Sequence, residues 1–215
     1  MTVREIELEN YPRREHFKYF NSLAYPYVGI TVSVDITDWL KKIKGRKQPF
    51  FLSFLYCVVN AANAVPEMRR RISGEKILEF STCQASYTVA LEDRTYAYCA
   101  VDCNMPLADF LPYAVKKQEE VKKHPSLEES EDAISQFFIS SLPWLSYTAI
   151  VQPVPSPADS NPRITWGKYF EQNGRVLIPV SLLCHHALVD GIHIAQFYQE
   201  LEQWLKESMD FMKET

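Results

Sequence analysis

The sequence predicts one domain, residues 1–215, of the α/β class: an α+β two-layer sandwich in which helices pack on a mixed, largely antiparallel sheet. Three observations indicate this fold. Strand-like and helix-like segments interchange without strict alternation. Asn173-Gly174, a strong hairpin signal, separates two strand-like segments. A length of 215 residues with 47% hydrophobic side chains suffices for one sizeable core.

The first half of the chain contains two helical patterns and four extended ones. Residues 12–22 are expected to form a short helix with Pro12 near its first turn, and residues 27–37 a strand rich in Val, Ile and Thr. Residues 49–71 are apolar on nearly every side up to Asn60, which indicates a largely buried helix. Three further strands are expected, the last two as a hairpin: 76–80, 86–92 and 95–101.

The second half contains two amphipathic helices separated by strands. Residues 107–124 are expected to form a helix that becomes charged towards its end. The helix expected at 190–208 has one apolar face, formed by Ile194, Phe197, Leu201 and Trp204. The loop "QPVPSPADSNPR" has no periodicity. Two strands are expected before this loop, at 134–140 and 145–151, and two after it, at 164–172 and 175–184.

Composition and charge argue against several classes of protein. A formal net charge of -4 gives no support for a basic, nucleic-acid-binding surface. The five cysteines are an odd number and several lie in apolar segments, so we expect free thiols in a reducing cytosol. The charged N-terminus has no apolar stretch typical of a signal peptide, and no segment reaches the roughly 18 apolar residues of a membrane span. These observations predict a cytoplasmic protein.

The segment "CHHALVDGIH" places polar side chains at the end of an apolar strand. Histidine has an unperturbed pKa of about 6.5, so His186 is a candidate general base near neutral pH. Asp190 either orients this ring or braces the loop, and the spacing leaves both roles open. A metal site could draw on His185, His186, Asp190 and His193. Adjacent strand residues point to opposite faces, however, so no metal is expected.

The motif "HHALVDG" resembles the signature of chloramphenicol acetyltransferases, which have a coenzyme A-dependent acyltransferase fold. Four other segments resemble that family in the same order and at nearly the same spacing: "RREHFKYF", "VDIT", "FFISSLPWLSYT" and "ITWGKYF". The resemblance covers essentially the whole chain. It implies transfer of an acetyl group from acetyl-CoA, the co-substrate, to a hydroxyl of chloramphenicol or a similar small molecule. Such an activity gives antibiotic resistance and forms no covalent enzyme intermediate.

The resemblance also implies the catalytic groups. His186 would take the proton of the acceptor hydroxyl, and the histidine before it would serve the fold. Ser140 would donate a hydrogen bond to the oxyanion of the tetrahedral intermediate, and Thr165 would hold a water molecule beside it. Asp190 would form a buried ion pair with Arg13 on the first helix and so brace the loop that carries the base.

The resemblance further implies how coenzyme A and partner subunits bind. Trp144 would line the pantetheine arm, Lys168 would lie near the 3′-phosphate, and Tyr169 would lie against the adenine. The family is a homotrimer with its active sites between subunits. The base would therefore come from one subunit, and much of the acceptor pocket from its neighbour.

The acceptor pocket departs from the family pattern. Three residues expected in it are smaller or less polar than their family counterparts: Phe20, Ala24 and Val28. Residues 152–163 are rich in proline, where the family is rich in Asn, Phe and Leu. Pro49 stands where a second phosphate-binding lysine is expected, with Lys47 two residues earlier. These differences leave the acceptor open.

Two alternatives remain at this point. A dihydrolipoamide acyltransferase-like enzyme would share the His-x-x-x-Asp pattern, but we find no lipoyl-bearing or tethering segment. A non-catalytic, ligand-binding relative of the fold would have no need of His186.

Overall fold

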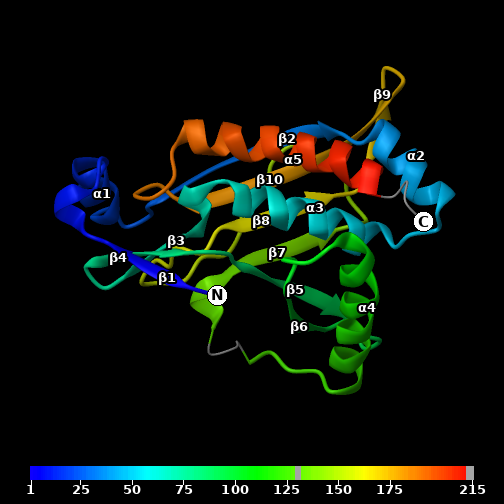
Figure 1. Cartoon of the computed structure of the whole chain (residues 1–215), viewed down its shortest axis with the longest axis horizontal. Coiled ribbons are helices and arrows are strands. Elements are labelled where there is room, and N and C mark those ends of the chain that lie inside the picture. The colour runs from blue at the N-terminus through cyan, green and yellow to red at the C-terminus, as the bar shows by residue number, and fades with distance from the viewer. Residues whose placement is uncertain (129–131, 212–215) are drawn as a thin grey trace.

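The computed structural model describes residues 1–128 and 132–211. Over these residues the chain forms a seven-stranded and a three-stranded sheet (Figure 1). The larger sheet has the order β2 (Tyr27–Asp35), β10 (Arg175–His185), β8 (Arg163–Gly167), β7 (Gln136–Leu142), β5 (Gln84–Ala90) and β6 (Tyr96–Val101). A short strand, β9 (Phe170–Gln172), also pairs with β10. The pairs β5–β7 and β7–β8 are parallel and the others antiparallel, so the predicted fold class is confirmed.

The smaller sheet lies at the same end of the molecule as the first helix, α1 (Arg14–Asn21) (Figure 1). Its order is β1 (Val3–Ile6), β4 (Lys76–Phe80) and β3 (Arg70–Ser73). Three short 3-10 helices occur at Leu8–Asn10, Pro66–Arg69 and Ala133–Ser135. The longer helices are α2 (Thr37–Gly45), α3 (Phe50–Ala64), α4 (Leu107–Lys123) and α5 (Gly191–Phe211).

Helices α3 and α5 run side by side along the larger sheet (Figure 1). The ring of Phe54 in α3 lies 5.1 Å from that of Trp166 in β8, and Phe197 of α5 is fully buried. Successive strand side chains point to opposite faces. Because Trp166 faces the helices, its neighbour Thr165 faces away from them. This alternation decides which side chains of the sheet can reach a ligand.

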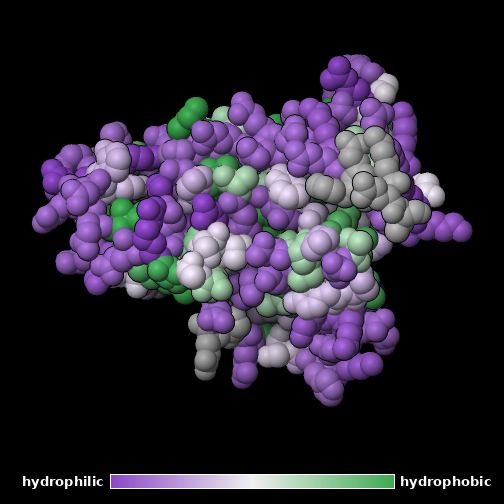
Figure 2. Space-filling model, viewed as in Figure 1, coloured by the Kyte–Doolittle hydropathy of each residue, from purple (hydrophilic) through white to green (hydrophobic). Residues whose placement is uncertain are grey.

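The surface on the helix side is mostly hydrophilic, with small, separate apolar patches (Figure 2). The apolar face predicted for the last helix is confirmed, since its residues are buried or packed against the core. The five cysteines are free and buried, as expected. Among the described residues, no helix combines the length and apolar character needed to cross a bilayer.

The hairpin predicted at Asn173-Gly174 joins β9 to β10. Both residues have positive φ angles, 52° and 75°, which a two-residue type I′ turn requires. Glycine adopts this conformation without strain and asparagine with little. The turn therefore fixes the register of β10, the strand that ends at the paired histidines.

Two predicted boundaries are wrong. The helix expected over 49–71 ends at Ala64, because Pro66 cannot continue it; a 3-10 turn and strand β3 follow. The strand expected over 164–172 is divided into β8 and β9. Between them the Lys168 N–H donates to the Leu145 carbonyl at 2.7 Å, outside any strand ladder.

The strand expected over 145–151 does not form. Its nearest strand, β8, is already paired on one edge with β7 and on the other with β10, so no edge is open to it. The segment lies across the end of β8 instead. A Cβ atom on Gly167 would stand 2.6 Å from the Leu145 carbonyl oxygen, so only glycine permits this approach.

Helix α2 is absent from the predicted elements. Its start is stabilised by Asp35, whose Oδ1 accepts hydrogen bonds from the Thr37 N–H and hydroxyl. Trp39 and Ile43 lie on its buried face. The lysines around them make the segment polar on average, so its short apolar face was not recognised in the sequence.

Candidate functional site

A row of hydroxyl side chains crosses the face of the larger sheet that the helices leave uncovered. Ser140 lies opposite Thr165 in the register of β7 and β8, and Thr165 lies opposite Ser181 in that of β8 and β10. Ser181 in turn lies opposite Thr31, and their hydroxyls are hydrogen-bonded at 2.7 Å. Because opposed residues share a face, this row brings together the two predicted hydroxyl groups, Ser140 and Thr165.

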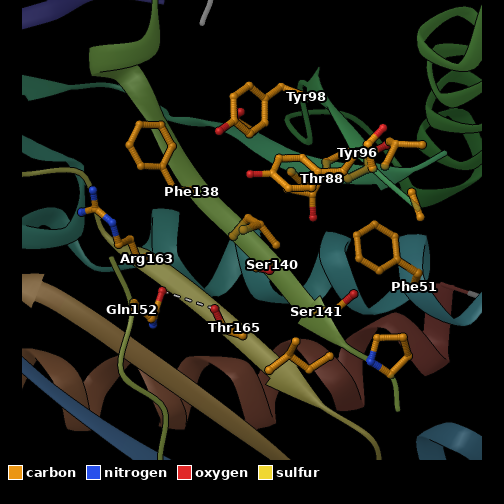
Figure 3. A pocket seen from close by; sticks show the side chains of 18 of the residues that line it. Phe51, Thr88, Tyr96, Tyr98, Phe138, Ser140, Ser141, Gln152, Arg163 and Thr165 are labelled. Atoms are coloured by element: carbon orange, nitrogen blue, oxygen red, sulfur yellow. Dashed lines mark hydrogen bonds between the residues drawn. The ribbon is translucent and has the colours of Figure 1, made fainter. Parts of the chain in front are cut away.

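A cavity of about 1120 Å³ is lined by Ser140 and Thr165, and we call it the serine pocket. Trp144 also lines it and is 73% exposed, at the end of β7. Pockets for small molecules typically measure about 300–1,000 Å³, so this one has room for an acceptor and part of a second ligand. Its other polar lining residues include Thr88, Tyr96, Tyr98, Gln152 and Arg163, and its apolar lining residues include Phe51 and Phe138 (Figure 3). Ile150 and Val151 also line it.

The segment that follows β7 closes one side of the serine pocket. The Tyr147 hydroxyl donates to the Thr165 carbonyl at 2.9 Å, which fixes the segment against β8. Further along, the Thr165 hydroxyl donates to Oε1 of Gln152 at 3.3 Å (Figure 3). The pocket floor is thus a strand, whereas this wall is a loop.

His186 lies just beyond the end of β10. Its Nδ1 is 2.9 Å from the Val189 carbonyl oxygen. A carbonyl can only accept, so Nδ1 carries the proton in the neutral ring and Nε2 has a free lone pair. The ring stacks on Phe20 of α1, with centroids 3.8 Å apart. We call His186 and Phe20 the histidine site.

His185, the other histidine of the pair, is buried, with 2% of its surface exposed. Its Nδ1 accepts a hydrogen bond from the Ala187 N–H at 3.3 Å. Burial lowers the pKa of this ring to about 4, and the charge of Asp159 opposes that effect only partly. The ring is therefore neutral at physiological pH and belongs to the core, apart from its neighbour.

Arg13 joins the start of α1 to the loop that carries His186. It donates to the His186 carbonyl at 3.2 Å, to Nδ1 of His193 at 3.2 Å, and lies 3.4 Å from Oδ2 of Asp190. The ion pair between Arg13 and Asp190 implied by the resemblance is present. It is not buried as expected, because the Asp190 side chain is 47% exposed at the start of α5.

The Asp190 carboxylate is stabilised mainly by the backbone. The N–H of Gly191 donates to it at 2.7 Å and, together with Arg13, lowers its pKa against the opposing effect of desolvation. The Asp190 N–H donates to Nδ1 of His193 at 3.0 Å. Asp190 thus contacts Arg13 and the loop backbone, and Nδ1 of His186 bonds to Val189 instead. The geometry favours the brace over the role of orienting the ring.

The histidine site and the serine pocket are separate within one chain. His186 follows Ser181 by five residues along β10, and Ser181 lies beside Thr165, so His186 is roughly 17 Å from the pocket floor at about 3.3 Å per residue. Two residues expected in the acceptor pocket lie on the histidine side: Ala24, exposed after α1, and Val28, opposite Cys184.

The expected coenzyme A residues are also divided. Trp144 lines the serine pocket, whereas Lys168 and Tyr169 lie outside it, in the turn between β8 and β9. Lys168 is exposed. The Tyr169 ring lies 5.6 Å from that of Phe50, and Nζ of Lys44 stands 5.4 Å above it. A cation and an aromatic ring therefore occur together there, and the cation over the ring is Lys44.

Sequence reasoning missed much of the pocket wall. Thr88, Tyr96 and Tyr98 share a face because of strand alternation, which the predicted hairpin already implied. Which face would be open could not be read from the pattern. Arg163 is held at 2.8 and 2.7 Å by both oxygens of Asp159, inside a segment read as an irregular loop. Within the described ranges, no three His, Cys, Asp or Glu residues are grouped to hold a metal ion.

Comparison with known proteins adds to this geometry. A family model described as "Chloramphenicol acetyltransferase" matches residues 1–202. A chloramphenicol acetyltransferase of a Klebsiella species is 28% identical over 204 residues, which cover 94% of this chain and 93% of the relative. A solved structure of a chloramphenicol acetyltransferase superposes with a TM-score of 0.82 at 23% identity, covering 95% of this chain and 100% of the other. A probable dihydrolipoamide acetyltransferase from Listeria monocytogenes reaches 0.67 at 14% identity, over 95% and 94%.

Proposed function

Because the chain belongs to the chloramphenicol acetyltransferase family and is an acyltransferase, we propose that it transfers the acetyl group of acetyl-CoA to a hydroxyl of chloramphenicol or of a similar small molecule. The hydroxyl oxygen attacks the thioester carbonyl directly. A carbon–oxygen bond forms, the carbon–sulfur bond breaks, and the hydroxyl proton passes through a base to the leaving thiolate. Without a base the attacking group is a neutral alcohol, which is a poor nucleophile.

His186 is that base. The observation that carries the proposal is its hydrogen bond to the Val189 carbonyl, 2.9 Å from Nδ1. This bond selects the tautomer whose Nε2 is unprotonated. Stacking on Phe20 holds the ring plane, and the Arg13 bond to the His186 carbonyl holds the backbone. A base that is pre-positioned in this way contributes roughly 10²–10⁴-fold to the rate.

The serine pocket stabilises the tetrahedral intermediate. Ser140 donates its hydroxyl proton to the oxyanion, and Thr165 beside it holds a water molecule or a substrate oxygen. Their side-by-side positions in the register of two paired strands support this assignment. Strand backbones are rigid, so the two hydroxyls keep their spacing while the bond to sulfur breaks.

The active site forms between two subunits of a homotrimer. The separation of the histidine site from the serine pocket supports this arrangement, because a general base must come within about 3 Å of the proton it removes. A neighbouring chain that places its His186 over the serine pocket completes the site. Phe20, Ala24 and Val28 then face the acceptor from the subunit that supplies the base.

Coenzyme A binds along the end of β7 and the turn after β8. The exposed Trp144 indole offers an apolar surface for the pantetheine arm. Tyr169 offers a face for the adenine, and Lys168, with Lys44 nearby, offers positive charge for the phosphates.

The first experiment measures free-thiol release from acetyl-CoA by purified protein, with and without chloramphenicol. We expect chloramphenicol-dependent release by the wild type. His186→Ala should lower the rate by about 10²–10⁴-fold with an unchanged melting temperature. His16→Ala, which removes an exposed histidine of α1, is the matched control and should keep full activity.

Each outcome tests a different part of the proposal. Release with another hydroxyl compound but not with chloramphenicol would keep the reaction and change the acceptor. No release with any acceptor of a panel of hydroxyl compounds would contradict acetyl transfer. Full activity of His186→Ala would contradict the assigned base.

A further inference from the structure

The ring of His193 lies between the Arg13 guanidinium and the first turn of α5. Its Nδ1 is 3.2 Å from Nη1 of Arg13 and 3.0 Å from the backbone nitrogen of Asp190. Both of these groups can only donate, so Nδ1 is unprotonated and accepts from both. The neutral ring therefore carries its proton on Nε2, which lies 4.0 Å from Oε1 of Glu67.

His193 also completes the start of α5. The Asp190 carbonyl accepts the first bonds of the helix, from the N–H groups of His193 and Ile194, so Asp190 is the N-cap and His193 is the third helical residue. A side chain at that position that accepts from the N-cap N–H forms one half of a capping box, a role usually taken by Glu or Gln. Here an imidazole takes that role. The cap therefore depends on an acceptor that a proton can remove.

The same ring nitrogen holds Arg13 beside the proposed base. Nη1 of Arg13 bonds to His193, while Nη2 donates to the His186 carbonyl at 3.2 Å. The ion pair of Arg13 with Asp190 is long, 3.4 Å, and solvent screening weakens it because the carboxylate is 47% exposed. The His193 side chain is only 14% exposed. His193 is thus the better shielded of these two partners of the guanidinium.

His193 lines a cavity of about 530 Å³ and keeps part of its ring exposed, so a proton from solvent can reach it. Burial is the main cause that lowers the pKa of this ring. The carboxylates of Glu67 and Asp190 raise that pKa, and the guanidinium groups of Arg13 and Arg70 lower it. The net shift is downward, so the ring is neutral near pH 7 and takes up a proton only at acid pH. Charged residues of β1 and of the segment after it also line the cavity: Arg4, Glu5 and Glu7.

A proton on Nδ1 converts the acceptor into a donor. The N–H groups of Arg13 and Asp190 then face another N–H, and a positive ring lies beside a positive guanidinium. Both hydrogen bonds to His193 break. The guanidinium that donates to the His186 carbonyl loses its shielded partner, and the position of His186 is no longer fixed.

We propose that neutral His193 is a positioning residue for the base: its Nδ1 ties Arg13 to the first turn of α5, and a proton on that nitrogen releases His186 and lowers acetyl transfer. The proposal rests on the function proposed above and adds a regulation of that site by pH. His193 itself touches neither substrate nor the reacting atoms.

The experiment measures thiol release from acetyl-CoA by the full chain, with chloramphenicol or another hydroxyl compound that the wild type acetylates. His193→Leu removes the acceptor. His193→Asn offers its Oδ1 near the place of Nδ1 and cannot be protonated there. His124→Leu, at an exposed histidine that ends α4, is the matched control.

At pH 7.5 we expect His193→Leu to lower kcat about 10-fold, because the base is displaced, and to keep the KM for acetyl-CoA within about 2-fold. His193→Asn should keep kcat within about 3-fold of the wild type, and His124→Leu should keep it unchanged. The double variant Arg13→Ala/His193→Leu should lose about as much as either single variant, since both changes remove the same contact.

The pH dependence separates this role from a merely structural one. Between pH 7.5 and pH 5, the kcat/KM of the wild type divided by that of His193→Asn should fall about 2-fold or more. Only the wild type has the acceptor that a proton removes, whereas the titration of His186 is common to both proteins and cancels in the ratio.

Three results would overturn the proposal. The first is wild-type kcat in His193→Leu at pH 7.5. The second is an equal loss in the Leu and Asn variants, because an acceptor at this position would then not matter. The third is a constant ratio over the pH range, which needs only the wild type and His193→Asn and so applies even if His193→Leu does not fold.

Failure of the proposed function gives a different pattern. In that case the wild type releases no thiol with chloramphenicol or with any other hydroxyl compound, and the proposal for His193 falls with it. Turnover by the wild type that is indifferent to His193 overturns the positioning role alone.

Discussion

The two adjacent histidines have different surroundings and therefore different roles, although they are consecutive in the sequence. His185 ends β10 and is buried, so its ring is neutral and structural. His186 lies past the strand end, where the backbone turns and its Nδ1 meets the Val189 carbonyl. Alternation along the strand predicted that the two rings would diverge. The partner of Nδ1 could not be predicted, since Asp190 offered a stronger acceptor at similar spacing.

The burial of His185 predicts a pH-dependent stability. Its pKa falls from 6.5 in the unfolded chain to about 4 in the folded protein. Below pH 6.5 the unfolded chain therefore takes up a proton that the folded protein refuses, and stability is lost as pH falls. By pH 5 this group should remove about 2 kcal/mol from the free energy of unfolding.

Urea unfolding at pH 7 and pH 5 measures this effect, with His185→Gln as the reference. The wild type should lose about 2 kcal/mol more than the variant between the two pH values. Equal losses would show that His185 is not held neutral by the fold.

At the scale of elements, α1 and the loop before α5 are tied together by Arg13. Its guanidinium makes hydrogen bonds to the His186 carbonyl and to His193, and an ion pair with Asp190. Because the carboxylate is half exposed, solvent screening reduces the strength of the ion pair. The bond to the carbonyl matters more for the proposed function, since it fixes the backbone of His186, the proposed base.

Arg13→Ala should lower the free energy of unfolding by about 1–2 kcal/mol and kcat by roughly 10-fold, through a displaced His186. Thermal unfolding and thiol release measure the two effects. Arg14→Ala, which removes an exposed pair with Glu15, is the control and should change both by little. An Arg13→Ala protein with wild-type stability and kcat would show that the tie has no role.

Elements with strong local signals formed where expected, and those that depended on neighbours did not. The hairpin at Asn173-Gly174 is set by its own backbone angles. Residues 145–151 have the alternation of a strand but no free sheet edge to join. A strand needs a neighbouring strand with a free edge. Both edges of β8 are occupied, by β7 and by β10, and the sequence does not show which segments pair with β8.

At the scale of the whole molecule, the proposed site is split, with the base at one end of β10 and the hydroxyl groups further along the sheet. This predicts complementation between two inactive variants. His186→Ala and Ser140→Ala are co-expressed in equal amounts. Each mixed trimer then contains one interface with both an intact histidine and an intact serine.

Random mixing should restore about a quarter of wild-type activity, since three quarters of the trimers are mixed and each has one intact site of three. Thiol release by the co-expressed protein, with each variant alone as a control, measures this recovery. Pairing wild type with the double variant should leave about a quarter of the sites intact, below the half that dilution alone would leave. Absence of recovery in demonstrably mixed trimers would place the site within one subunit.

The sequence by itself determined the fold class, the order of most elements, the hairpin before β10 and the family motif around His186. These features depend on local periodicity, turn chemistry and short spacings, which are written along the chain. Only the tertiary structure decided which sheet face is open, that Asp190 is half exposed, that Gln152 meets Thr165, and that His186 lies apart from Ser140. Each of these depends on which distant segments pack together, and packing selects among arrangements that local patterns leave equally allowed.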